Sequence, residues 1–295
     1  YILMKYLVYG GNGWIGSMFI KLLKKHQLEY YTSKLRLDNT DAIETEIKLI
    51  NPTHIVCLIG RTYGEYNGEK IGTIDYLEEP GKLVDNIRDN LFSPLSLAMI
   101  CQKRDIHLTY LGTGCIFTQN EELIANSEGY SENSKPDFFG SSYSVVKGFT
   151  DRLMHQFDKN ILNIRIRMPI VNYSHPRNFI TKITNYEKIC SIQNSMSYLP
   201  ELLPIMLDLS KNKEVGTINL TNPGTISHNE ILELYKTYVD PAFTWNNFTI
   251  DEQDTILDSK RSNNKLNTNK LKKLYPRLMP IKEAIKLCFL NFKTN

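Results

Sequence analysis

Short apolar runs alternate with longer amphipathic stretches along most of the chain. The short runs are rich in β-branched and aromatic residues and indicate strands, whereas the longer stretches repeat apolar residues at helical spacing. The predicted strands cover residues 5–9, 28–32, 54–59, 107–111, 163–167 and 217–220. This alternation predicts an α/β fold with right-handed crossovers and a doubly wound parallel sheet, whose ligand binds at the carboxyl ends of the strands.

One predicted helix, residues 83–103, is longer than the others. Its apolar side is formed by Ile87, Leu91, Leu95 and Met99. Asn90 lies on another face of the same helix. The polar and aromatic segment 63–80 before it is too long for a simple connection, which favours a functional loop at the mouth of a site.

The order of the predicted elements divides the chain into two parts. We assign residues 1–170, together with about 200–221, to a nucleotide-binding domain of the Rossmann type. Residues 171–199 and 222–295 then form a smaller C-terminal lobe that binds the substrate, with two or three helices after residue 224.

Composition narrows the class of protein. The 295 residues are 41% hydrophobic and 23% charged, as in ordinary globular proteins, and the net charge of +3 with scattered basic residues gives no reason to expect nucleic acid. No apolar run reaches the roughly 18 to 20 residues of a membrane span. The five cysteines form no Cys-x-x-Cys pair and the histidines show no ligand spacing, so we expect no disulfide scaffold, no metal and a reducing, cytoplasmic compartment.

A glycine-rich turn follows the first predicted strand and opens the first helix. Gly10 permits a tight turn, Gly13 lets backbone amides approach a pyrophosphate, and Gly16 allows the helix to pack closely on the strand. Asn12, Trp14 and Ile15 lie within the same turn. We therefore predict a dinucleotide cofactor at this position.

The end of the second strand indicates which dinucleotide binds. An acidic residue there would hydrogen-bond the ribose 2′-hydroxyl of NADH, but the chain has hydroxyl and cationic side chains instead. A 2′-phosphate could be bound by Ser33, Lys34 and Arg36, so we predict NADPH. The simple alternative is that Lys34 and Arg36 only face solvent. Further expected cofactor contacts are Cys57, Leu58, Gly60, Asn90 and Pro169.

The spacing Tyr143-x-x-x-Lys147 places a phenol and an ammonium on one face of a helix. A neighbouring cation favours the phenolate, so we expect Lys147 to lower the pKa of Tyr143 and make it a proton donor and acceptor near neutral pH. Thr113 ends the fourth predicted strand at the same edge of the sheet. A threonine, a Tyr-x-x-x-Lys helix and a glycine-rich first turn are typical of short-chain dehydrogenases/reductases, in which Tyr143 and Lys147 also contact the cofactor.

Seven motifs make the chain resemble one family of that class. They lie at residues 10–16, 113–117, 138–147, 165–170, 176–184, 222–232 and 261–264. The chain resembles the bifunctional UDP-4-keto-6-deoxy-D-glucose 3,5-epimerase/4-reductases that complete UDP-L-rhamnose synthesis. Action on a dTDP- or GDP-linked sugar, and a non-catalytic NADP-binding regulatory protein, remain alternatives.

The resemblance implies further site residues. Epimerisation needs a second acid/base pair, for which we expect Cys115 and Lys182, with His175 as an alternative to Lys182. Cys115 follows Thr113 by two residues, so both side chains would lie on one side of an extended strand end. Asn178 and Arg261 are expected to bind the substrate. The class commonly forms dimers, so we also expect a homodimer.

Overall fold

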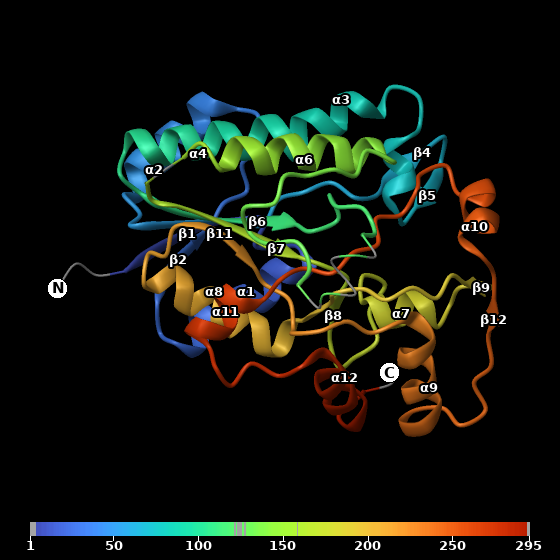
Figure 1. Cartoon of the computed structure of the whole chain (residues 1–295). Helices are drawn as coiled ribbons and strands as arrows, with labels where there is room; N and C mark the ends of the chain where they lie inside the picture. The colour runs from blue at the N-terminus through green and yellow to red at the C-terminus, as the bar shows by residue number, and fades with distance from the viewer. Residues whose placement is uncertain (1–3, 121, 123–125, 127, 158, 294–295) are drawn as a thin grey trace.

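A parallel six-stranded sheet forms the centre of the molecule, which we describe from a computed structural model covering residues 4–120, 122, 126, 128–157 and 159–293 (Figure 1). Its spatial order is β11-β7-β6-β3-β1-β2. The strands are β1 (Lys5–Tyr9), β2 (Glu29–Thr32), β3 (His54–Cys57), β6 (His107–Thr113), β7 (Ile161–Ile166) and β11 (Gly216–Asn219). The predicted fold class is therefore confirmed, and all six predicted strands are present.

Helices cover both faces of the sheet, which explains why its strands are continuous apolar runs. The helices on one face are α1 (Trp14–Lys25), α8 (Leu199–Lys211) and α11 (Asn269–Leu274). Those on the other face are α2 (Thr40–Ile50), α4 (Ser93–Lys103) and α6 (Ser142–Met154). Each face has its own hydrophobic core, so the carboxyl edge of the sheet is left for a ligand.

The predicted long helix is continuous but not regular. It consists of α3 (Lys82–Ile87), a π-helical turn η2 (Arg88–Phe92) and α4. Asn90 in the π turn is buried, whereas Ile87 and Met99 of the predicted apolar side are 41% and 57% exposed. These two residues of the predicted apolar side thus face outward, and α4 instead buries Leu97, Ala98, Ile100 and Cys101 in the core.

The predicted loop 63–80 is folded. It contains the antiparallel hairpin β4 (Gly64–Tyr66) and β5 (Glu69–Ile71), followed by the 3₁₀ turn η1 (Ile74–Leu77). Asn67 and Gly68 connect the hairpin with φ angles of 50° and 82°, the left-handed pair that tight hairpin turns require. Aromatic side chains of this segment pack beside α6, because Tyr76 and Leu77 form a small buried cluster with Tyr143.

A separate hydrophobic core lies below the sheet edge (Figure 1). Its elements are β8 (Pro169–Ile170), α7 (Phe179–Ile183), β9 (Lys188–Ile189), β10 (Ser197–Tyr198), α9 (His228–Tyr238) and α12 (Ile281–Leu290). Strand β12 (Asn246–Asn247) pairs with β9 and leads to α10 (Ile250–Ile256). The described residues after 224 thus form four helices rather than two or three, because α10 and α11 are too short to show a clear periodicity.

Within the described part of the chain, no helix is both long and apolar enough to cross a membrane.

Candidate active site

Helix α6 is anchored where it presents Tyr143. Ser141 caps the helix by accepting a hydrogen bond from the Ser144 amide at 3.1 Å, and the Ser144 hydroxyl donates to the Cys115 carbonyl at 2.8 Å. The Ser142 amide donates to Glu78 Oε1 at 2.7 Å. The first turn of α6 is therefore fixed to the loop after β6 and to the end of η1, which brings Tyr143 beside both segments.

Thr113 ends β6, and the chain turns immediately after it. The Cys115 amide donates to Thr113 Oγ1 at 3.0 Å, and the Gly114 carbonyl accepts from the buried Arg167 and Asn264. The extended strand end that we predicted is therefore absent. Cys115 still packs against the cluster that contains Tyr143, so the turn also brings the Cys115 side chain near Tyr143.

The electrostatic environment of Tyr143 differs from the predicted one. Burial is the main cause that raises the pKa of Tyr143 well above its usual value, the Cys115 side chain raises it further, and a hydrogen bond with Thr113 lowers it. Lys147 is not a cause of this shift. The geometry thus keeps Tyr143 protonated, as a donor needs to be, instead of acidifying it.

Lys147 has a different partner from the one expected. Its ammonium donates to the hydroxyl of Tyr110, a buried residue of β6, and lies 4.7 Å from the centre of that ring. Burial lowers the pKa of Lys147 to about 8, while Cys57, Asp151 and Cys115 raise it. Spacing along α6 placed Lys147 on the correct face but did not reveal that a second phenol holds its ammonium.

The glycine-rich turn between β1 and α1 fits a dinucleotide. Gly10 has a φ of 78°, and a Cβ there would lie 2.9 Å from the Leu58 carbonyl carbon. A Cβ on Gly16 would lie 2.0 Å from the Gly10 carbonyl oxygen, so α1 packs directly on the turn. Gly13 precedes α1 without a side-chain cap, which leaves the first amides of the helix for a pyrophosphate. Asn12, Trp14 and Ile15 belong to this turn and to the first residues of α1.

Charged residues gather after β2 and β3. Arg36 Nη2 and Arg61 Nε lie 3.2 and 2.5 Å from the carboxylate of Asp89, and Arg88 reaches the same carboxylate at 3.0 Å. Ser33 is buried, with its hydroxyl accepting from the Leu35 amide at 3.1 Å. Lys34 is exposed. Arg61 and Asp89 were not predicted, although Arg61 directly follows the predicted Gly60.

The other predicted cofactor residues have different environments. Asn90 is buried and uses both ends of its amide on the backbone of Arg61, at 2.9 Å each, so its side chain positions the end of β3. Cys57 is buried in the core, in a strand paired with β1 and β6 on its two sides. A Cβ added to Gly60 would lie 3.4 Å from Asn90 Oδ1, so the backbone at Gly60 passes close to this amide. Pro169 opens β8 after Met168, which has a φ of 38°.

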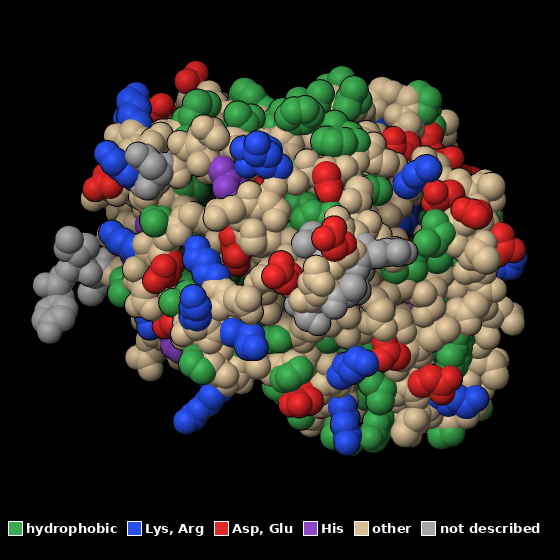
Figure 2. Space-filling view, viewed as in Figure 1, with side chains coloured by type: hydrophobic (Ala, Val, Ile, Leu, Met, Phe, Trp, Pro, Cys, Tyr) green, Lys and Arg blue, Asp and Glu red, His purple; other side chains and the backbone are tan. Residues whose placement is uncertain are grey.

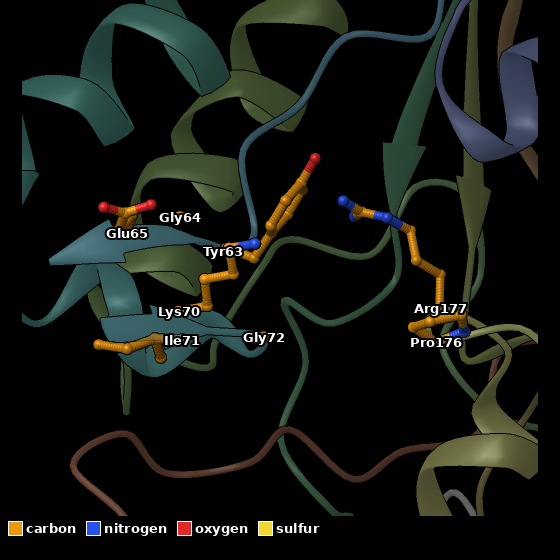
Figure 3. Close-up of a pocket in the computed structure, with 8 residues that line it drawn as sticks. All are labelled: Tyr63, Gly64, Glu65, Lys70, Ile71, Gly72, Pro176 and Arg177. Atoms are coloured by element: carbon orange, nitrogen blue, oxygen red, sulfur yellow. The ribbon is translucent and has the colours of Figure 1, made fainter. Parts of the chain in front are cut away.

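A cleft of about 440 Å³ lies between the hairpin and the segment before α7. Its walls are Tyr63, Gly64, Glu65, Lys70, Ile71, Gly72, Pro176 and Arg177 (Figure 3). Tyr63 and Arg177 extend toward one another from opposite sides, with the guanidinium carbon 3.5 Å from the ring centre. Ile71 belongs both to this cleft and to the cluster around Tyr143 and Cys115, so the cleft adjoins these two candidate residues.

Cations converge on this cleft from three segments. Lys182 donates to the Gly72 carbonyl at 3.4 Å, and its pKa is lowered by burial and then by Arg177 and Arg261. Arg261 forms an ion pair with Asp75 of η1. Among the described residues, no hydrogen bond or ion pair joins Lys182 to Cys115. The structure therefore places Lys182 beside the cleft, whereas Arg261 is held by Asp75 of the neighbouring η1 segment.

Asn178 and His175 have partners that argue against a direct chemical role. Asn178 is fully buried, caps α7, and donates to the carbonyls of Val171 and Tyr173 at 2.9 and 2.8 Å. Its side chain is committed to the backbone, so the expected substrate contact is corrected to a structural one. The His175 ring stacks on Trp14 at 5.0 Å, at the glycine-rich turn.

Comparison with known proteins identifies the family of this fold and site. The model of the NAD dependent epimerase/dehydratase family matches residues 6–186. Protein L780 of Acanthamoeba polyphaga mimivirus is 53% identical over 283 residues, which are 96% of each chain. The crystal structure of that protein, a UDP-rhamnose synthase, superimposes with a TM-score of 0.94, covering 98% of this chain and 99% of that one at 52% identity.

Two plant proteins are also similar to this chain in sequence. The bifunctional dTDP-4-dehydrorhamnose 3,5-epimerase/dTDP-4-dehydrorhamnose reductase of Arabidopsis thaliana is 40% identical over 95% of this chain and 90% of the relative. A trifunctional UDP-glucose 4,6-dehydratase, epimerase and reductase of the same plant is also 40% identical, but this chain spans only 41% of its length. The chain therefore belongs to the NAD-dependent epimerase/dehydratase family and, within it, to the nucleotide-sugar 3,5-epimerase/4-reductase enzymes that include UDP-rhamnose synthase.

Proposed function

We propose that the substrate of this enzyme is UDP-4-keto-6-deoxy-D-glucose, which it epimerises at carbons 3 and 5 and reduces at carbon 4 to UDP-L-rhamnose. The observation that carries the proposal is the convergence of Thr113, Tyr143 and Cys115 beside a cleft with three cationic side chains. Hydroxyl donors suit a keto oxygen, a thiol suits proton exchange at carbon, and the cations suit a diphosphate.

In the reduction, Thr113 and Tyr143 both donate hydrogen bonds to the 4-keto oxygen. A bound reduced nicotinamide supplies hydride to carbon 4. The buried Tyr143 holds its proton at neutral pH and transfers it to the oxygen as negative charge develops there. Residues of the 10–16 turn hold the pyrophosphate, and Lys147 contacts the nicotinamide ribose.

In the epimerisation, the same two donors stabilise the enolate oxygen. One of Cys115 and Lys182 removes the proton next to the keto group, and the other returns a proton to the opposite face. Burial and the neighbouring cations lower the pKa of Lys182, which increases the neutral fraction that accepts a proton. Both side chains lie next to the hairpin wall of the cleft, because Cys115 clusters with Ile71 and Lys182 donates to the Gly72 carbonyl.

The cofactor that we propose is NADPH. Ser33, Lys34 and Arg36 follow β2, and Arg61 follows β3 next to Arg36, so two guanidinium groups lie where a 2′-phosphate would bind. Each guanidinium pairs with Asp89, and a phosphate would compete for the same nitrogens. We further propose a homodimer, discussed below, and a cytoplasmic location, with which the five free cysteines agree.

The experiment mixes purified protein, NADPH and UDP-4-keto-6-deoxy-D-glucose, and follows absorbance at the NADPH band while NMR identifies the product. We expect NADPH oxidation and UDP-L-rhamnose. A parallel reaction with the dTDP-linked sugar tests the alternative nucleotide, and a kcat/KM higher with dTDP would reassign the substrate. Constant NADPH absorbance with both sugars, in a protein that binds NADPH, would refute the reductase.

A further inference from the structure

Tyr110 is a buried polar residue that the reaction described above does not use. It lies in β6, three residues before Thr113, and only 1% of its surface is exposed. Its backbone pairs with Cys57 of β3 on one side and with Asn163 of β7 on the other. The ring therefore points from the middle of the sheet into the layer between the sheet and α6, where Lys147 lies.

The contact between Tyr110 and Lys147 has two components. The Lys147 ammonium donates a hydrogen bond to the Tyr110 hydroxyl, and it lies 4.7 Å from the centre of the same ring. Lys147 is itself buried, at 4% exposure, so its ammonium has lost most of its hydration. A buried ammonium needs acceptors, and a hydroxyl together with an aromatic face supplies two kinds of compensation.

The other groups around Lys147 do not replace this contact. Those that face it are Cys57 of β3, Cys115 after β6 and Asp151 of α6. Asp151 is engaged by Arg165, whose Nε and Nη2 lie 2.8 and 2.7 Å from its two oxygens, and by Asn163 at 2.8 Å. The one side-chain hydrogen bond described for the Lys147 ammonium goes to Tyr110.

We propose that Tyr110 is a positioning residue for the reduction: its hydroxyl and ring hold the Lys147 ammonium, in charged form, at the position from which it would contact the nicotinamide ribose. The inference rests on the proposed reductase function. Tyr110 touches neither substrate nor cofactor, and it acts through Lys147. Because the hydroxyl accepts a hydrogen bond, its removal destabilises the charged lysine more than the neutral one.

Tyr110→Phe tests the proposal, since it keeps the ring and removes only the acceptor. In the intact enzyme we expect the alkaline limb of the kcat/KM profile for NADPH oxidation to move to lower pH by about one unit, as a lost hydrogen bond to a charged group implies. At pH 8, close to the pKa of Lys147, the rate falls about fivefold, while solvent-deuterium exchange into the substrate continues. A merely structural role would lower stability without moving the profile.

Tyr6→Phe is the matched control, because Tyr6 is an equally buried tyrosine of the same sheet, in β1, outside the catalytic and cofactor residues. Its profile should match the wild type. An unshifted profile in folded Tyr110→Phe would overturn the proposal. If that variant fails to melt as a native protein, 3-fluorotyrosine at position 110 keeps the shape and weakens the acceptor, and it must shift the profile in the same direction.

Failure of the wild-type enzyme to oxidise NADPH would refute the proposed function instead. The two failures are therefore distinguishable, because the Tyr110 comparison is made only relative to an active wild type.

Discussion

Asp75 and Arg261 are 186 residues apart in the chain, yet they form a two-point ion pair with nitrogen–oxygen distances of 3.2 and 2.5 Å. Asp75 also accepts from the amide and the hydroxyl of Ser259, at 3.1 and 2.7 Å. Arg261 had been expected to bind substrate, and here it ties the η1 segment beside the cleft to the C-terminal loop. A direct contact between Arg261 and the substrate and a structural ion pair with Asp75 predict different effects of substituting these residues.

If the pair acts as a link, Asp75→Ala and Arg261→Ala will raise KM for the nucleotide sugar by similar factors, about tenfold, because either change frees the hairpin wall. The double variant will then be no worse than the single ones, which a double-mutant cycle measures. An Arg261→Ala effect far larger than that of Asp75→Ala would instead support a direct contact with the substrate. Hydrogen bonds and the charge of Arg261 outweigh burial and lower the pKa of Asp75 to about 2, so the pair stays formed through the neutral range.

Cys115→Ala and Lys182→Met should each suppress solvent-deuterium exchange at carbons 3 and 5 by at least about 100-fold, the usual size of a lost acid/base group, without weakening NADPH binding. NMR of the substrate incubated in deuterium oxide measures the exchange. Cys190→Ala and Lys188→Ala are matched controls, because both residues lie in or next to β9 and outside the site. Normal exchange in both site variants would contradict the epimerase assignment.

Arg36→Ala should weaken NADPH binding about tenfold and leave NADH binding nearly unchanged, because the lost guanidinium contacts only the 2′-phosphate. Titration of the two cofactors, followed by fluorescence, gives the ratio of dissociation constants. Arg152→Ala removes a cation from the last turn of α6 and serves as the control. Equal losses for both cofactors would place Arg36 elsewhere.

Acid should destabilise the protein through two histidines, the buried His54 and the half-buried His228. Burial is the main cause that lowers the pKa of His54 and of His228 to about 4, from an ordinary value of 6.5. The unfolded chain therefore binds protons that the folded chain does not, and stability falls as pH drops from 6.5 to about 4, by roughly 3 kcal/mol for each histidine. Thermal melts of His54→Gln should show a smaller loss over this window than wild type, whereas the exposed His26→Gln should not.

An outward apolar patch should pair two copies of the chain. Its members, on α3, η2, α4 and α6, are Leu83, Val84, Ile87, Phe92, Met99, Phe149 and Leu153, each at least 41% exposed. Figure 2 shows hydrophobic side chains gathered along the corresponding edge of the molecule. A contiguous apolar surface of this kind marks a protein interface.

Val84→Glu and Met99→Glu should therefore raise the dimer dissociation constant by about 100-fold, since each buries a charge in the interface. Sedimentation velocity distinguishes monomer from dimer. Leu49→Glu is the control, because Leu49 is 81% exposed on α2, outside the patch. A wild type that sediments as a monomer at micromolar concentration would contradict the homodimer.

The centre of the sheet was predictable because β1, β3, β6 and β7 are buried on both faces, so each of them is a continuous, mostly apolar run in the sequence. The glycine-rich turn was predictable for a related reason, since Gly10 and Gly16 tolerate no Cβ. Both features depend on residues that are close together in the sequence. Asn178 was not predictable in this way, because the same amide that suits a sugar also caps a helix, and only the fold decides between them.

Lys147 shows the same limit at the active site. Its position one turn after Tyr143 follows from spacing, but the choice between Tyr143 and Tyr110 as its partner depends on how α6 lies against β6. The hairpin within 63–80 contains the Asn67-Gly68 turn signal, which the sequence carries between two short strands. Asn-Gly between two short strands is typical of a hairpin turn, so the hairpin was predictable from the sequence, although only a loop was predicted there.

The π turn at Arg88–Phe92 accommodates one extra residue without interrupting the helix. A regular α-helix with the same number of residues would be about 1.5 Å longer, and α3 would be rotated by about 100° relative to α4. Asp85 and Asn86 would leave Tyr76 and Ser142, which they now contact at 3.1 and 3.3 Å. The extra residue, held as a bulge, thus keeps α3 in phase with α6, so that Asp85 and Asn86 stay beside their partners.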